Sequence, residues 1–125
     1  MKKIKIGDKY YKLDKQLGMF FGAYLADGSI NGNRISICKI SKDFINLTKD
    51  IAKRFSTHAK KRDYKGEYGK GTDTPFNSKE LSKFIYKEFK TGSYNKVIPG
   101  FVFASNKDFI SGIINGYFSG DGNVN

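Results

Sequence analysis

Two aspartates stand in matching places near the two ends of the 125-residue chain, and a glycine follows each of them. Asp27-Gly28 ends one apolar segment, and Asp121-Gly122 ends another 94 positions later. Two carboxylates brought close together repel each other unless they are protonated or share a cation. Oxygen ligands of this kind suit Mg²⁺, which keeps part of its water shell and takes further ligands from phosphate. If the fold joins the two aspartates, they form a candidate metal site directed at a polyanion.

The segments that precede the two aspartates share a spacing of small residues, which predicts how they pack. The small residues lie four positions apart: Gly18, Gly22 and Ala26 in the first segment, and Gly112, Gly116 and Gly120 in the second. This spacing places each set on one face of a helix, where an internal glycine costs about 1 kcal/mol relative to alanine. Two helices that both carry this cost are expected to pack backbone to backbone along these faces. Packed in parallel, they bring Asp27 and Asp121 together at one end.

Three helices are predicted before residue 90 and a fourth near the end of the chain. Each begins at a polar residue and carries apolar residues at helical spacing. The first ends at Asp27. The expected N-caps are Asp14, Ser41, Ser78 and, for the last helix, either Asn106 or Asp108.

Strand signals fall in pairs between the first three helices. They cover residues 29–30 and 34–38, joined by a turn at Asn31-Gly32, and then 57–64 and 72–76, joined by a glycine-rich loop. The element order is therefore α-ββ-α-ββ-α, followed by a further helix. Because the strands come in hairpins, we expect an α+β fold in which helices cover one face of an antiparallel sheet.

The charge of the chain favours a polyanionic partner. It has 23 Lys and Arg against 12 Asp and Glu, a formal net charge of +11. Such an excess favours binding to nucleic acid, although a solubilising coat of lysines is the alternative. No apolar run approaches the roughly 20 residues of a membrane helix, and the basic start lacks the apolar core of a secretory signal. We therefore expect an intracellular protein, in the cytoplasm or nucleoid, that does not bind a membrane.

The motifs FFGAYLADGSI and INGYFSGDGNV resemble the two signature helices of the LAGLIDADG homing endonucleases. Between them, NKVIPGF resembles the family's K-x-I-P block and contributes Lys96. A half-domain of this family has the order αββαββα, in agreement with the elements above. The resemblance implies that residues 1–105 form a first half-domain. Residues 106–125 are then the helix that opens a second half-domain, which we expect to be incomplete in this chain.

The resemblance implies a site-specific endonuclease that takes part in intron or intein mobility. Such an enzyme hydrolyses phosphodiester bonds of double-stranded DNA with Mg²⁺ or another divalent cation. Asp27 and Asp121 would be metal ligands and catalytic residues, and Lys96 a catalytic residue near the scissile phosphate. Two alternatives use the same fold: a DNA-binding module that does not cleave, and an RNA-splicing maturase. Whether this chain cleaves DNA alone is left open.

Strand alternation predicts which side chains face the DNA. Ile35 and Ile37 should point toward the helices, which leaves Arg34 and Ser36 on the open face of the sheet. A sheet laid in the major groove can offer such side chains to base edges, and arginine with guanine is the best-matched pair. The full expected DNA-binding set is Arg34, Ser36, Lys39, Lys60, Arg62, Tyr64, Lys70, Thr72 and Thr74.

The last helix also carries an apolar face away from its glycines, made of Ile113, Ile114, Tyr117 and Phe118. An uncovered apolar patch of this kind is typical of an association surface. We therefore expect the chain to self-associate or to bind a separately supplied second half-domain.

Overall fold

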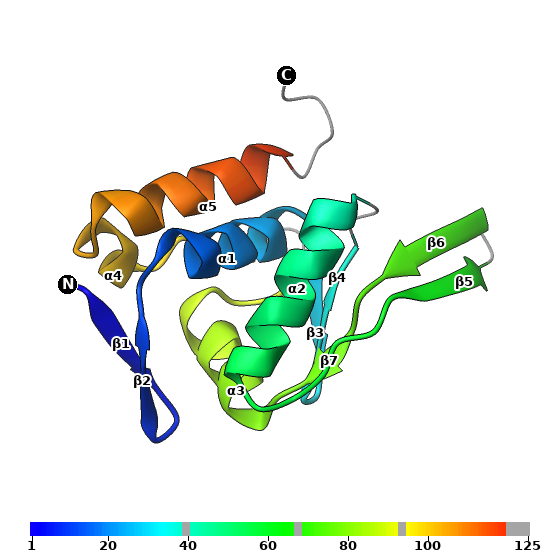
Figure 1. The fold of residues 1–125 in the computed structure, drawn as a ribbon, viewed down its shortest axis with the longest axis horizontal. Coiled ribbons are helices and arrows are strands. Elements are labelled where there is room, and N and C mark those ends of the chain that lie inside the picture. The colour runs from blue at the N-terminus through cyan, green and yellow to red at the C-terminus, as the bar shows by residue number, and fades with distance from the viewer. Residues whose placement is uncertain (39–40, 67–68, 93–94, 120–125) are drawn as a thin grey trace.

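The computed structural model describes residues 1–38, 41–66, 69–92 and 95–119, and Figure 1 shows their arrangement. The helices are α1 (Lys15–Asp27), α2 (Lys42–Arg54), α3 (Lys79–Glu88), α4 (Gly100–Phe103) and α5 (Lys107–Ser119). The strands are β1 (Lys3–Ile6), β2 (Lys9–Lys12), β3 (Gly28–Asn31), β4 (Arg34–Ile37), β5 (Arg62–Gly66), β6 (Gly69–Asp73) and β7 (Phe76–Asn77). All strand pairs are antiparallel, so the predicted α+β class is confirmed.

Helices α1, α2, α3 and α5 begin where the sequence predicts, because polar side chains cap their first turns, whereas the short α4 was not predicted and has no side-chain cap. The side chains of Asp14, Ser41 and Ser78 accept hydrogen bonds from backbone N–H groups of α1, α2 and α3. For α5, the Asn106 side chain accepts from the Phe109 N–H at 2.9 Å, which decides between the two predicted starts. None of the helices among the described residues is long and apolar enough to span a membrane.

Helix α1 is the centre of the core. It contacts α2, α5, β3 and β4, and the side chains of Phe20, Phe21 and Tyr24 are fully buried. Phe21 stacks on Phe89 and meets the edge of Phe109, so aromatic packing joins α1 to the elements on either side. The end of α1 is therefore held in a fixed place.

The strands form three small antiparallel sheets, where the sequence predicted one. Strand β4 lies between β3 and β7, while β1 pairs with β2 and β5 with β6. Pro75 lies between β6 and β7, and its missing N–H explains why the second hairpin does not continue as one long strand. Figure 1 shows β5 and β6 extending away from the body as a two-stranded ribbon.

Three local predictions differ from the structure. The β3–β4 turn is Gly32-Asn33, one residue later than predicted, and Gly32 supplies its positive φ of 64°. Strand β5 begins at Arg62 instead of residue 57, and the ribbon takes in Gly66 and Gly69, where a loop was predicted. The β1–β2 hairpin was missed, although its alternation of lysine and isoleucine before Gly7 is a strand signal.

Candidate functional site

Helices α1 and α5 pack backbone to backbone through their glycines, side by side in Figure 1. A Cβ added at any of four glycines would collide with a carbonyl oxygen of the opposite helix. These close approaches are Gly18 to Phe109, Gly22 to Ile113, Gly112 to Lys15, and Gly116 to Met19. The partner residues advance along both helices in the same direction, so the helices are parallel. We call this contact the glycine seam.

The seam brings the C-terminal ends of α1 and α5 to the same end of the molecule. Ala26 and Asp27 are half-buried in the last turn of α1, and the Asp27 carbonyl accepts from the Cys38 N–H at 3.1 Å. Helix α5 is described through Ser119, so Gly120 and Asp121 lie outside the described residues. Within the described ranges, no cluster of three His, Cys, Asp or Glu side chains could hold a metal ion. Asp27 supplies a hard oxygen donor of the kind that Mg²⁺ prefers, and its pairing with Asp121 stays a prediction.

Lys96 lies at the same end of α1. Its Nζ donates hydrogen bonds to the carbonyl oxygens of Tyr24 at 2.9 Å and of Gly28 at 2.6 Å, and lies 4.6 Å from the centre of the Tyr24 ring. These carbonyls lie at the C-terminal end of α1, where a cation is favoured, and the Tyr24 carbonyl also accepts the Gly28 N–H. Burial lowers the pKa of the Lys96 ammonium, while the nearby acidic groups of Asp27 and Cys38 act against that shift. The structure therefore brings Lys96 and Asp27 together.

A second polar cluster lies on the sheet face, where β4, β5 and β6 meet. The Asp73 carboxylate is only 4% exposed. It accepts hydrogen bonds from Arg62 Nε at 2.9 Å, Arg62 Nη2 at 2.7 Å and Ser36 Oγ at 2.6 Å. Burial acts to raise the pKa of Asp73, but these hydrogen bonds and the charges of Arg62 and Arg34 hold it below its usual range. Asp73 is therefore an anion at neutral pH.

This cluster borders a pocket of about 390 Å³. Its lining residues are Ser29, Ile30, Asn31, Arg34, Ser36, Cys38, Arg62 and Asp73. We call this the sheet-face pocket. Asp73 was not predicted as a site residue, since acids scattered through a basic hairpin are typical of a solvated surface. The available signal was the hairpin register, because Arg62 and Asp73 are cross-strand partners.

The predicted DNA-binding residues divide into three groups. Arg34, Lys60 and Arg62 are exposed and Thr72 is partly exposed, as a surface that meets DNA requires. Ser36 and Thr74 are buried, so neither side chain is exposed as predicted, although Ser36 lines the sheet-face pocket. Lys39 lies outside the described residues, as do the side chains of Tyr64 and Lys70.

The burial of Thr74 has a structural cause. Its N–H donates to the Ile37 carbonyl at 3.2 Å, so the chain after β6 turns in against β4. Ser36 is buried because its hydroxyl binds Asp73 beneath the Arg62 side chain. Strand alternation alone could not show either contact, because both depend on how the second hairpin docks on the first.

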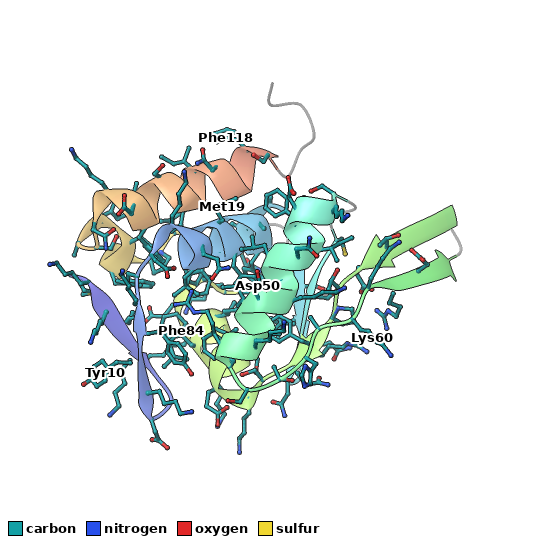
Figure 2. The ribbon with its side chains drawn as sticks, in the orientation of Figure 1. Tyr10, Met19, Asp50, Lys60, Phe84 and Phe118 are labelled. Carbon is teal, nitrogen blue, oxygen red and sulfur yellow. The ribbon has the colours of Figure 1, made fainter. Side chains whose placement is uncertain are left out.

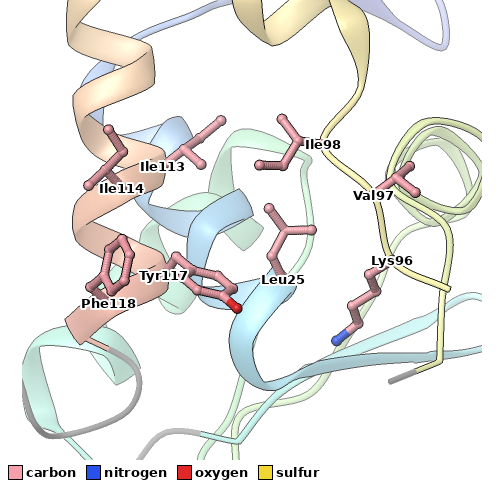
Figure 3. A pocket seen from close by; sticks show the side chains of 8 residues that line it. All are labelled: Leu25, Lys96, Val97, Ile98, Ile113, Ile114, Tyr117 and Phe118. Carbon is pink, nitrogen blue, oxygen red and sulfur yellow. The ribbon is translucent and has the colours of Figure 1, made fainter. Parts of the chain in front are cut away.

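An apolar groove runs beside the outer face of α5 (Figure 3). Its volume is about 450 Å³, and its lining residues are Leu25, Lys96, Val97, Ile98, Ile113, Ile114, Tyr117 and Phe118. Of the four residues predicted to form this face, Ile114, Tyr117 and Phe118 are exposed. Ile113 is buried, because its backbone lies in the glycine seam opposite Gly22. Figure 2 shows Phe118 on the side of α5 that faces away from the core.

Comparisons with known proteins place these features in a family. The sequence profile of the LAGLIDADG-like domain matches residues 14–88. Over 114 residues, the chain is 37% identical to DNA-directed RNA polymerase subunit Rpo1C of Methanocaldococcus jannaschii, covering 91% of this chain and 13% of that protein. Over 61 residues, it is 41% identical to a DNA polymerase of Thermococcus sp. strain GE8, covering 49% of this chain and 4% of that protein. The chain thus spans only a small part of each relative's length. The domain profile matches more than half of the 125 residues of this chain. The chain belongs to the LAGLIDADG family.

Proposed function

We propose that the chain is the first half-domain, with the opening helix of the second, of a site-specific endonuclease that cleaves double-stranded DNA. One observation carries this proposal: the glycine seam sets the ends of both signature helices at one end of the molecule, beside Lys96. Asp27 and Lys96 lie at this end of α1, which supports a site there. The boundary between the half-domains falls near residue 105, before the helix that Asn106 caps.

The carboxylates of Asp27 and Asp121 would hold a divalent cation such as Mg²⁺. When bound, the cation would activate water for attack on the scissile phosphate and stabilise the leaving oxygen. Lys96 is anchored by two carbonyl oxygens, so its ammonium stays at a fixed place next to Asp27. A fixed positive charge there would stabilise the negative charge that develops on the phosphate.

The sheet face and the ribbon of β5 and β6 would bind the duplex. Exposed Arg34 and Arg62 lie on these elements, exposed Lys60 lies on the segment leading into β5, and the chain has a net charge of +11. Both reported relatives are polymerases, of which the chain matches only 13% and 4%. Matching so little of a long host protein supports an element of intein or intron type carried inside it. A DNA-binding module without cleavage and an RNA-splicing maturase are the alternatives.

A plasmid-nicking assay tests the proposal. The chain is incubated with supercoiled DNA and Mg²⁺, as wild type and as Asp27→Asn. Nicking by the wild type, lost in Asp27→Asn while the affinity for duplex DNA is kept, would support the endonuclease. Asp50→Asn on α2 is the matched control, because it makes the same chemical change at an exposed residue outside the seam (Figure 2 labels Asp50). Duplex binding without nicking would favour the non-cleaving module, and a preference for structured RNA would favour the maturase.

Salt dependence tests the DNA interface separately. Binding that neutralises phosphates releases counterions, so the affinity for duplex DNA should fall steeply between about 50 and 200 mM salt. A titration by fluorescence anisotropy at several salt concentrations gives the slope. An affinity that does not change with salt would contradict the proposed interface.

A further inference from the structure

Asp73 and Arg62 form an ordered pair on the face that we propose meets DNA. We propose that Asp73 is a positioning residue for sequence recognition: it holds the Arg62 guanidinium in the orientation that reads a guanine. This inference rests on the proposed binding of duplex DNA. It adds a residue that does not itself touch the nucleic acid, and it names one base.

The geometry of the pair fixes the plane of the guanidinium. Asp73 Oδ1 accepts from Nε at 2.9 Å and Oδ2 from Nη2 at 2.7 Å, so two parallel hydrogen bonds hold one edge of Arg62. Ser36 in turn holds Oδ2 at 2.6 Å from the neighbouring strand. The carboxylate is buried and bonded from two strands, so it cannot rotate without losing several hydrogen bonds. An arginine on a ribbon that extends from the body is thereby tied to the three-stranded sheet.

The orientation suits a guanine. Asp73 engages the Nε–Nη2 edge, and the guanidinium's outer end presents N–H groups from Nη1 and Nη2 in a planar fork. Guanine is the base whose major-groove edge offers two adjacent acceptors, N7 and O6, to such a fork. The Arg62 side chain is 47% exposed at the sheet-face pocket, so its outer end can reach a base edge. Because the side chain is ordered before binding, less conformational entropy is lost when DNA arrives.

The ion pair also makes the expected role of Arg62 different from that of a lysine that contacts phosphate. Asp73 compensates the charge of Arg62 at short range, so Arg62 adds little to the general attraction for a polyanion. Loss of Arg62 should therefore change base preference more than salt dependence. A phosphate contact would do the opposite, since each one adds about 0.9 to the slope of log affinity against log salt.

The test measures base preference and salt slope together. A preferred duplex is selected from a random DNA library with the wild-type chain, and affinities are then measured with the four bases at each position. We expect a guanine preference of about tenfold or more at one position, within the range of a good arginine–guanine pair. Asp73→Asn and Arg62→Ala should each remove that preference at the same position, and the double variant should lose no more than either single one.

Two further variants separate positioning from charge and from folding. Arg62→Lys keeps the charge without the fork, so it should lose the guanine preference and keep the affinity for random DNA. Asp63→Asn removes an exposed carboxylate from the same ribbon and should leave the guanine preference unchanged. Thermal unfolding of each variant shows whether the fold is intact.

The outcomes are distinct. If Asp73→Asn folds and keeps the guanine preference, the ion pair is only structural and the inference is overturned. If Asp73→Asn does not fold, Arg62→Lys still decides, since a retained guanine preference there overturns the inference as well. Absence of duplex binding by the wild type overturns the proposed function itself. If the wild type binds duplex DNA but shows no guanine preference, only the proposed role of the Arg62–Asp73 pair is overturned.

Discussion

The glycine seam and the β5–β6 ribbon differ in what they place: the seam packs two backbones together, and the ribbon exposes side chains. In the seam, α1 and α5 approach so closely that four positions have no room for a Cβ. The ribbon extends away from the body in Figure 1, and side chains on its two strands meet, as where Thr72 Oγ1 donates to Asp63 Oδ1 at 2.7 Å. In the seam, glycines lack side chains, so the two helix backbones pack directly against each other. The ribbon presents side chains to a partner.

The contrast teaches that stability and recognition lie in different parts of this fold. A backbone-to-backbone contact cannot adjust to a larger residue, because the colliding atoms are main-chain carbonyls. An exposed ribbon can accept most polar replacements with little change in stability. We therefore expect substitutions in the seam to unfold the chain, and substitutions in the ribbon to change binding.

The largest effect is expected in the seam. Gly116→Leu places a side chain against the Met19 carbonyl oxygen, so α5 must move away from α1. We expect the free energy of unfolding to fall by about 3 kcal/mol or more, at the upper end of overpacking effects. Denaturant unfolding measures this change. Gly100→Ala is the control, because nothing lies within 4 Å of its added Cβ. Equal effects at both glycines would mean that α5 does not dock on α1.

A smaller loss of stability is expected on replacing Lys96, which is bonded to the end of α1. Lys96→Met keeps a long unbranched side chain, although a slightly shorter one, and removes the hydrogen bonds to Tyr24 and Gly28. We expect the free energy of unfolding to fall by about 1–3 kcal/mol, the usual range for hydrogen bonds from a charged donor, although the Tyr24 carbonyl keeps the Gly28 N–H. Lys83→Met on the exposed side of α3 is the matched control and should change stability by less than about 0.5 kcal/mol.

The effect of Lys96 should also depend on pH. Burial lowers its pKa in the folded state, so the folded chain holds this proton less tightly than the unfolded chain does. Stability then rises as pH increases from the lowered pKa toward the ordinary value of 10.5. The difference between wild type and Lys96→Met should therefore grow as the pH approaches 10.5. Thermal unfolding across this pH range measures the difference in stability. A difference that shrinks as the pH rises would contradict a lowered pKa for Lys96.

The same contrast explains what the sequence could predict. The caps at Asp14 and Ser78 and the glycine spacing are local patterns, so helix starts and the face shared by α1 and α5 follow from the sequence. The burial of Thr74 and the Ser36–Asp73 hydrogen bond depend on how one hairpin docks on another. Residues 37 positions apart make that contact, and no periodicity reports it.

At the apolar groove beside α5, we expect a substitution to change self-association more than stability. Ile114 and Phe118 are about half exposed, so Phe118→Ser should change the free energy of unfolding by no more than about 0.5 kcal/mol. It should, however, weaken association of the chain, which sedimentation over a range of concentrations measures. Phe103→Ser is the control, since Phe103 is 74% exposed and does not line the groove. A wild type that is monomeric at all concentrations would contradict self-association through this face.

The smallest effect on stability is expected in the ribbon, where two opposite charges predict opposite changes in binding. The Asp63 carboxylate is exposed and lies 3.7 Å from Lys61 Nζ, and an ion pair this exposed contributes only about 0.2 kcal/mol or less. Asp63→Asn should therefore leave thermal unfolding nearly unchanged but strengthen duplex binding, because it removes a negative charge that repels phosphate. Lys60→Gln, on the segment leading into β5, should weaken binding and lower the salt slope by about 0.9 if Lys60 contacts one phosphate. Both affinities come from the same salt titration. If the two variants shift the affinity in the same direction, this ribbon does not lie along the DNA backbone, and the surface that binds the polyanion must be sought on another face of the molecule.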